Sequence, residues 1–355
     1  MCLMSDHPKR LLSLDALRGF DMAMIIGFGE VLRTLAAAAG APTLAQQFEH
    51  VAWEGFRIED LIFPMFVFIA GASQTFALPR ASTQLGRGGA ALRLTKRCII
   101  LFLIGVIYGG GFSKGWDGVR WLGVLQRIAL ASLGAGLLSL WLKPRGLVAA
   151  AVALLGGYWA LLTFTNGGNF AEGANFANQF DARWLPGRKY DGDHDPEGIL
   201  STLPAIATAL LGVLAGTWLQ TGATAARKTA SLAIAGVISI ALGWAWSWQF
   251  PVVKKLWTSS FVLVAGGWSA LLLALFYYII EIRNWRAWAT PFVWIGMNPI
   301  TLYIVVNLAQ PRTLATRFTG PIPHGPWEWI GPAVGFGLLL ALARFLYKRG
   351  IFIRV

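Results

Sequence analysis

The segment His50–Asp60 reads HVAWEGFRIED, and the segment Leu61–Gly71 continues it as LIFPMFVFIAG. One histidine and four charged groups therefore stand directly before, or inside the start of, an apolar run long enough to enter a bilayer. Ionisable side chains are costly inside a membrane and usually serve a function there. If the chain does chemistry, this stretch is the first place to expect it.

The composition of the 355-residue chain is that of a membrane protein. Hydrophobic residues make up 56% of the chain and charged residues 13%, and the mean hydropathy is +0.57, far from the balance of a soluble globule. Apolar runs of roughly 20 residues, the length that spans a bilayer, recur from end to end. We therefore expect an all-α, polytopic transmembrane helical bundle that forms a single domain over residues 1–355.

Ten apolar runs are candidate spans. They lie at roughly 16–37, 55–78, 93–112, 121–142, 146–165, 198–220, 229–248, 258–280, 289–309 and 327–348. With both ends placed in the cytoplasm, the inward connections carry more Lys and Arg than the outward ones, as the positive-inside rule requires. The sequence thus predicts about ten spans, with both ends cytoplasmic.

The excess of basic residues does not indicate a nucleic-acid-binding protein. The net charge is +13, but the Lys and Arg residues lie in short inter-helix loops and form no basic face or arm. They fit topology signals and contacts with anionic lipids. The two cysteines, Cys2 and Cys98, support neither a disulfide framework nor a thiolate metal site.

One connection, residues 166–197, is much longer than the others and rich in acidic residues. Loops of this length are either functional or disordered. Its acids raise the alternative of calcium binding, but the acids at 191–197 lack the spacing and closing Glu of an EF-hand. We interpret this loop as a solvated lid on the outer side.

Several charged residues repeat at helical spacing inside the predicted bundle. Asp15, Arg18 and Asp21 follow one another at three-residue steps on one face of the first span, and Arg57 and Asp60 repeat that step at the outer end of the second. Mutual neutralisation is the structural explanation. The predicted topology brings further groups to the same outer level, which favours a site: Glu30, His50, Trp53, Arg127, the segment 195–198, Ser259 and Ser260.

His50 is the residue of this group best suited to chemistry. Histidine titrates near neutrality, can act as a base and then an acid, and can carry an acyl group on nitrogen. A carboxylate would fix its tautomer, with Asp60 or Glu30 as the candidates. A lone interfacial histidine is more often a polar anchor, so the surrounding motif decides the interpretation.

Asn298 and Pro299 interrupt the ninth run at mid-membrane depth. A proline there frees backbone carbonyl groups, and an adjacent amide can satisfy a ligand. A tolerated kink packed against neighbouring helices explains the same pair equally well.

Six blocks closely resemble the heparan-α-glucosaminide N-acetyltransferase family and its bacterial membrane relatives. They are LSLDALRGF at 12–20, the His50–Gly71 stretch, GVLQR at 123–127, DPEG at 195–198, LWTSS at 256–260 and GMN at 296–298. The blocks occur in the family order and cover nearly the whole chain. The resemblance implies transfer of acetyl from cytoplasmic acetyl-coenzyme A across the membrane to the amine of a glucosamine-type amino sugar on the periplasmic side.

The resemblance and the placement of the charges together predict three groups of site residues. The catalytic group is His50, which aligns with the active-site histidine of the family, with Asp60 and Glu30. The cofactor-binding group is Asp15, Arg18, Arg57, Arg127 and Asn298. The substrate-binding group is Trp53, Glu54, Asp195, Glu197, Ser259 and Ser260. Because a thioester is already activated, we expect acetyl-coenzyme A as co-substrate and no metal.

The chain departs from the family in two places. Eukaryotic members carry an Asn-Tyr-Gly stretch late in the first span, where this chain has Gly27-Phe28-Gly29-Glu30, a difference that bears on the acceptor. The lumenal N-terminal domain of the lysosomal enzyme has no counterpart here. The resemblance therefore implies an integral protein of a bacterial inner membrane.

The chemistry and two other function classes stay open at this point. His50 would serve as base or accept the acetyl group first, with Arg57 or an amide stabilising negative charge. A secondary transporter of a sugar or small anionic solute is the main alternative, because broken helices and intramembrane charges also build substrate pathways. A lipid-linked structural protein is the third. Membrane lipids, coenzyme A and the amino sugar are the expected partners, nucleic acid is not, and a homodimer is left open.

Overall fold

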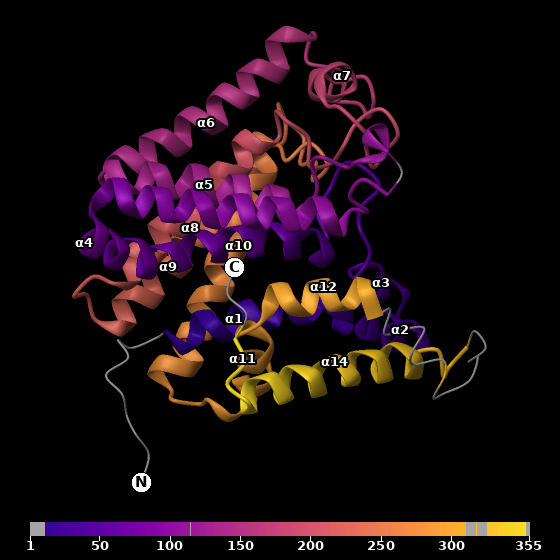
Figure 1. The fold of residues 1–355 in the computed structure, drawn as a ribbon, viewed down its shortest axis with the longest axis vertical. Coiled ribbons are helices and arrows are strands. Elements are labelled where there is room, and N and C mark those ends of the chain that lie inside the picture. Colours follow the sequence, from indigo (N-terminus) through magenta and orange to yellow (C-terminus); the bar gives the residue numbers. More distant parts are fainter. Residues whose placement is uncertain (1–10, 114, 310–316, 318–324, 353–355) are drawn as a thin grey trace.

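The computed structural model describes residues 11–113, 115–309, 317 and 325–352. Within these ranges the regular elements are helices, as predicted, and β-bridges occur only as isolated pairs in the loops (Figure 1). The helices are α1 (Leu12–Ala23), η1 (Met24–Phe28), α2 (Gly29–Ala38), α3 (Pro42–Gln46), α4 (Ile58–Tyr108), η2 (Trp116–Gly118), α5 (Val124–Trp141), α6 (Pro144–Thr165), α7 (Phe176–Trp184), α8 (Thr202–Leu219), α9 (Ala225–Trp246), α10 (Ser259–Tyr277), η3 (Tyr278–Ile282), η4 (Ala287–Ala289), α11 (Thr290–Gly296), α12 (Pro299–Ala309) and α14 (Ile330–Lys348).

Helix α4 is one continuous element by hydrogen bonding, but its chain reverses at Gly86. This glycine has φ +71° and ψ 170°, outside the helical region. Gln74 and Leu94, on opposite sides of it, both lie against Gly136 of α5. Tyr108, at the end of α4, stacks on Tyr303 with ring centroids 5.0 Å apart. Helix α4 is therefore a hairpin whose two ends lie at the same end of the bundle.

Helices α4, α8 and α10 form the centre of the molecule, and α6, α9 and α14 lie at its periphery. The most apolar windows of the three central helices are 61% buried, whereas those of α6, α9 and α14 are 28%, 17% and 22% buried. Ile234, Val237 and Leu242 on α9 are exposed. In a bilayer such side chains face lipid, so the peripheral helices form the outer layer.

Seven helices among the described residues are long and apolar enough to cross a membrane, or eight if the pair α11 and α12, bent by 69°, counts as one span. The protein is thus an integral membrane protein of helical type. The predicted number of about ten spans is not confirmed by this criterion. The predicted cytoplasmic position of the ends is not confirmed either, since residues 1–10, which include Cys2, and 353–355 lie outside the described part of the chain.

The first predicted span is a broken helix. Helices α1 and α2 are joined by the π-helical turn η1, where Gly27 has φ +133°. A left-handed residue of this kind favours glycine and interrupts the regular hydrogen-bond ladder. The break changes the direction of the chain before Glu30 and the loop that leads to His50.

The predicted lid loop contains more structure than the sequence indicated. Helix α7 lies inside residues 166–197, and the side chain of Asn175 caps it by accepting from the backbone N–H of Asn178 at 2.9 Å. Asn178 and Asp181 are buried. Their short polar side chains satisfy backbone groups of the segment, which explains order in a stretch that has no apolar periodicity.

Candidate active site

His50, Asp60 and Lys254 form a three-residue cluster at the N-terminal end of α4. The His50 Nδ1 atom lies 3.0 Å from Asp60 Oδ1. The Lys254 Nζ atom lies 2.9 Å from His50 Nδ1 and 3.2 Å from His50 Nε2, and 3.5 Å from Asp60 Oδ1. The His50 side chain is 56% exposed and that of Asp60 is fully buried. An exposed ring thus lies over a buried carboxylate.

The position of Asp60 in the first turn of α4 fixes the direction of its carboxylate. Oδ2 accepts hydrogen bonds from the backbone N–H groups of Arg57 at 3.1 Å and Val51 at 3.3 Å. Oδ1 remains directed at His50. The N-terminal end of a helix also favours a negative charge. The local sequence therefore supplies both the charge and the orientation of the group that holds the imidazole.

Lys254 enters the cluster from the segment 251–258, between α9 and α10. The backbone N–H of Gly55 donates to the Val252 carbonyl at 2.9 Å, which joins this segment to the loop that carries His50. Burial lowers the pKa of Lys254, while the negative charges of Asp60 and Glu59 oppose that shift. In the sequence, Lys254 is one of several basic residues in the loops that are predicted to face outward. Its position two residues before the LWTSS block is the one available signal.

Trp53, Glu54 and Arg57 lie around the cluster but do different work. The Trp53 indole N–H donates to the Phe170 carbonyl at 3.0 Å, which ties the loop of His50 to the predicted lid. Glu54 pairs through its backbone with Val253. The Arg57 guanidinium donates to the His50 carbonyl at 3.4 Å, so it contacts the backbone of His50.

Glu30, the second carboxylate predicted to orient His50, lies in another ion pair. Its Oε1 is 2.9 Å from Arg33 Nη2, and Arg33 Nη1 is 3.6 Å from Glu49 Oε1. Among the described hydrogen bonds, Asp60 supplies the carboxylate that contacts the His50 ring. The geometry therefore favours Asp60 as the orienting group.

A second polar cluster centres on Arg120, which is not among the site residues predicted from the sequence. Its guanidinium bonds to both carboxylate oxygens of Asp195 at 2.8 and 2.7 Å and to Glu197 at 2.6 Å. Burial alone would lower the pKa of Arg120, but the two carboxylates outweigh it and raise that pKa. Burial raises the pKa of Glu197, with Arg127 opposing. Asp195 and Glu197 thus hold the end of the predicted lid against the bundle.

Arg127 approaches the same segment from α5. It is 1% exposed, its guanidinium carbon lies 4.8 Å from the centroid of the Trp257 ring, and it donates to the Gly198 carbonyl at 3.3 Å and to the Ser201 hydroxyl. Its Nε and Nη1 atoms have no hydrogen-bond partner among the described residues. A buried guanidinium with unused donors can bind an anionic or carbonyl ligand by donating hydrogen bonds to it.

The serines of the LWTSS block are used by the fold. Ser259 donates to the Leu155 carbonyl at 2.7 Å and Ser260 to the Pro251 carbonyl at 3.0 Å. Both side chains are buried. They position the segment that carries Lys254, and these hydrogen bonds do not reach His50. Their predicted contact with substrate stays a prediction.

The remaining predicted cofactor residues lie elsewhere in the bundle. Arg18 pairs with Asp15 at 3.1 Å and donates to the Ser73 hydroxyl at 2.5 Å, between α1 and α4. The Asn298 amide donates to the Ile351 carbonyl at 2.9 Å at the break between α11 and α12. The structure therefore does not bring these residues into the His50 cluster, and their role as a coenzyme path stays a prediction.

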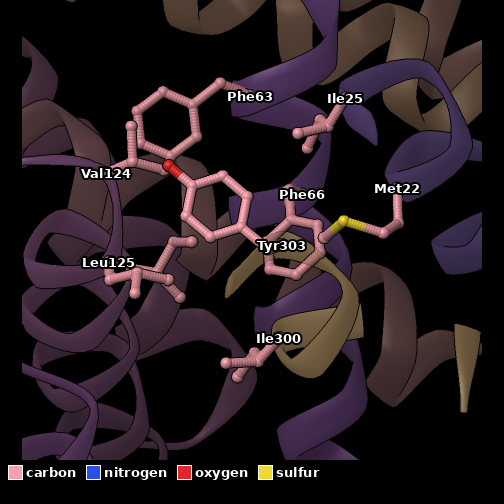
Figure 2. Close-up of a pocket in the computed structure, with 9 residues that line it drawn as sticks. Met22, Ile25, Phe63, Phe66, Val124, Leu125, Ile300 and Tyr303 are labelled. Carbon is pink, nitrogen blue, oxygen red and sulfur yellow. The ribbon is translucent and has the colours of Figure 1, made fainter. Parts of the chain in front are cut away.

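Two cavities lined by residues of the described part of the chain do not include His50. The first, of about 10 Å³, has room for about one water molecule. Figure 2 shows the ring of Tyr303 projecting into it between Phe63 and Leu125. The second, of about 360 Å³, includes Thr75, Arg87 and Gln220 near the α4 reversal. Space for a larger molecule therefore lies near the Gly86 turn of α4, at the opposite end of the bundle from His50.

One group of side chains in the loops has the composition of a metal site. Glu172, Asp191 and His194 have ligand atoms within 4.8 Å of one another. However, the Lys255 ammonium lies 2.6 Å from Glu172 and 3.1 Å from Asp191. The lysine neutralises the two carboxylates, so their proximity is explained as an ion-pair network that closes the lid segment onto the neighbouring loop.

Comparison with known proteins places this arrangement in a family. Residues 10–244 match the family described as heparan-alpha-glucosaminide N-acetyltransferase, catalytic. The chain is 28% identical to the human heparan-alpha-glucosaminide N-acetyltransferase over 371 residues, covering 85% of this chain and 53% of the human protein. The mouse protein of the same name is also 28% identical, over 87% of this chain and 56% of its own length.

The chain thus spans about half the length of the curated relatives that it matches. The matched region contains the His50–Asp60 pair, the α4 hairpin and the Arg120–Asp195 cluster, which is most of what the geometry identifies as a candidate site. The family match and the geometry therefore point to the same part of the molecule. We conclude that the chain belongs to the heparan-alpha-glucosaminide N-acetyltransferase catalytic family.

Proposed function

We propose that the protein transfers an acetyl group from acetyl-coenzyme A to the amine of a glucosamine-type amino sugar. The observation that carries this proposal is the His50–Asp60 pair, 3.0 Å apart, with an exposed ring over a buried carboxylate. The pair lies inside the region that matches the catalytic family. A buried acid that orients an accessible imidazole is the arrangement that general-base catalysis requires.

The chemistry follows from the tautomer that Asp60 selects. Nδ1–H donates to the carboxylate, so the Nε2 lone pair faces outward and can take a proton from the acceptor amine. The amine nitrogen then forms a bond to the acetyl carbon, the bond from that carbon to sulfur breaks, and the proton passes to the departing thiolate. A route in which His50 accepts the acetyl group first uses the same ring nitrogen.

Ten passes through the membrane follow if the breaks are counted as we propose. The segment α1–η1–α2 makes one pass, α4 makes two because it reverses at Gly86, and the bent pair α11–α12 makes one. The helices α5, α6, α8, α9, α10 and α14 make the other six. Both ends then lie in the cytoplasm and His50 faces the periplasm of a bacterial inner membrane.

In this topology the coenzyme approaches from the end of the bundle opposite to His50. Arg18, held by Asp15 and Ser73, lies near that end with Asn298. Guanidinium groups are well suited to bind the phosphates of the coenzyme. Arg127, with its unused donors in the bundle, would contact the part of the coenzyme nearer the thioester.

The acceptor sugar binds on the outer side, between the loop of His50 and the lid. Trp53 offers an aromatic face for a sugar ring, and its hydrogen bond to Phe170 links it to the lid. The carboxylates of Glu54, Asp195 and Glu197 would attract a protonated amine. Asp195 and Glu197 are already neutralised by Arg120, so Glu54, which is exposed, is the freest of the three.

An assay on the purified protein tests the proposal. Detergent-solubilised wild-type protein, incubated with radiolabelled acetyl-coenzyme A and glucosamine, should release labelled N-acetylglucosamine. The His50→Ala variant should fold and bind coenzyme A but lose transfer. Uptake of sugar into vesicles without covalent change would instead assign the chain to the secondary transporters, and wild-type turnover in His50→Ala would remove the imidazole from the mechanism.

A further inference from the structure

Lys254 is the cation in contact with the His50 ring, and the other basic side chains nearby are engaged elsewhere. Arg57 donates to the His50 backbone carbonyl, Lys255 is paired with Glu172 and Asp191, and Arg120 is paired with Asp195 and Glu197. The Lys254 ammonium is therefore the positive charge that the described part of the structure brings to the reacting nitrogen.

The Lys254 ammonium lies beside both nitrogens of the His50 ring. Its Nζ atom is 2.9 Å from Nδ1 and 3.2 Å from Nε2. Because Nδ1–H is directed at Asp60 Oδ1 at 3.0 Å, the lone pair of the ring is on Nε2. An atom on the line of that lone pair would lie much farther from Nδ1 than from Nε2, so Lys254 leaves Nε2 free to receive the proton of the acceptor amine.

We propose that Lys254 is a catalytic residue of the transfer: its ammonium, held beside the His50 ring, donates to the carbonyl oxygen of the acetyl thioester and stabilises the negative charge that develops there. This inference rests on the proposed acetyltransferase function. An amine that gives a proton to Nε2 must lie about 3 Å from that atom. The carbonyl oxygen of the carbon that it attacks then falls within reach of a donor already 3.2 Å from Nε2.

The segment that carries Lys254 is held firmly enough to place a donor. Its two ends are tied together because Thr258 donates to the Pro251 carbonyl at 2.8 Å and accepts from the Val253 N–H at 3.1 Å. Trp257 adopts φ +54°, a conformation that costs energy for a residue other than glycine. Strain of this kind clusters at functional sites, where the surrounding structure maintains it.

The positive charge of Lys254 has a counter-charge close by. The side chain is 18% exposed and shares the fully buried Asp60 carboxylate with His50. The Asp60 carboxylate therefore remains beside the ammonium as a counter-charge while one of the three N–H groups of Lys254 donates to the substrate. Lys254 donates a hydrogen bond and transfers no proton, so the bonds formed and broken are those of the acyl transfer itself.

Lys254→Met, which preserves length and removes charge, tests this role. Lys254→Arg is the charge-conserving variant, and Lys255→Arg, which keeps the charge that pairs with Glu172 and Asp191, is the control on the adjacent lysine. Loss of one oxyanion donor lowers kcat by roughly 10²–10³-fold. We expect that loss in Lys254→Met with unchanged affinity for coenzyme A by isothermal titration, partial recovery in Lys254→Arg, and a kcat close to wild type in Lys255→Arg.

The outcomes separate this inference from the proposed function. Wild-type kcat in Lys254→Met would overturn the role of Lys254 while leaving acetyl transfer intact. Equal losses in Lys254→Met and Lys255→Arg would overturn it as well, because they would show a general disturbance of the loop. A wild-type protein that transfers no acetyl group would refute the proposed function itself.

Discussion

The Asp60 carboxylate serves two structures at once. One oxygen accepts the backbone N–H of Arg57, the residue that caps α4, and the backbone N–H of Val51 in the preceding loop, and the other oxygen contacts the His50 ring. The same residue thus starts the helix and orients the proposed base. These hydrogen bonds explain why an acidic residue is tolerated at the start of an apolar helix, where an unpaired charge would be costly.

Replacing Asp60 by Asn should separate the two roles. The amide oxygen can still accept from the Arg57 N–H, so α4 keeps its N-terminal hydrogen bond, but the charge that stabilises an imidazolium is lost. In a serine protease triad the equivalent change lowers kcat by roughly 10⁴-fold. We expect Asp60→Asn to lose acetyl transfer by at least about 10²-fold, measured as steady-state kcat.

Glu30→Gln provides the comparison for that variant. Glu30 pairs with Arg33, and Asp60 makes the hydrogen bond to His50, so the loss should be larger for Asp60→Asn than for Glu30→Gln. A larger loss in Glu30→Gln would assign the orienting role to Glu30 and contradict the geometric assignment.

At the scale of elements, the centre of the bundle depends on close contact between α4 and α8. A Cβ atom placed on Gly71 would lie 2.0 Å from the backbone carbonyl oxygen of Ala209. Small residues allow helices to approach this closely, and in a membrane such packing replaces the missing hydrophobic drive between helices. The glycine is therefore required by the crossing and not by its own backbone conformation.

Gly71→Ala should destabilise the protein for that reason. The added methyl group meets backbone atoms that cannot rotate away, so the helices must separate, at a cost of about 1–3 kcal/mol. A lower temperature of unfolding in detergent, followed by loss of monodisperse protein, would show it. Gly157→Ala on α6 is the matched control, because a Cβ there meets nothing within 4 Å, and equal destabilisation of the two variants would argue against the crossing.

At the scale of the whole molecule, the reversal of α4 decides which loops share a face. Because the chain turns at Gly86, both ends of α4 lie beside Tyr303 and the His50 loop, whereas the turn lies at the opposite end. The proposed function requires the His50 loop and the Gly86 turn, at opposite ends of the bundle, to face different compartments, since the two substrates would arrive from opposite sides.

Cysteine labelling tests that orientation. In a background without Cys2 and Cys98, single cysteines at the exposed positions Gln84 and Tyr190 should react with a membrane-impermeant maleimide from opposite sides of oriented vesicles. Tyr190→Cys should be labelled from the periplasmic side and Gln84→Cys only after permeabilisation. Labelling of both from one side would contradict the proposed topology.

The residues of the site differ in how well the sequence predicts them. His50 and Asp60 lie ten residues apart, so the start of a helix could bring them together and their pairing was predictable. Arg120 and Asp195 are 75 residues apart, and Lys254 lies 204 residues from His50. Apart from the LWTSS block beside Lys254, nothing in the local pattern distinguishes Arg120 or Lys254 from other loop cations, so the sequence alone does not assign either residue to the site.

The sequence by itself determined that this is a helical membrane protein with a charged motif at the start of α4, because apolar run length and the spacing of charges are properties of short segments. The tertiary structure alone decided that α4 folds back on itself, that Asp60 and not Glu30 contacts the His50 ring, and that Lys254 completes the cluster. Such contacts depend on which helices pack together, and packing is set by shape complementarity between distant segments that no local pattern records.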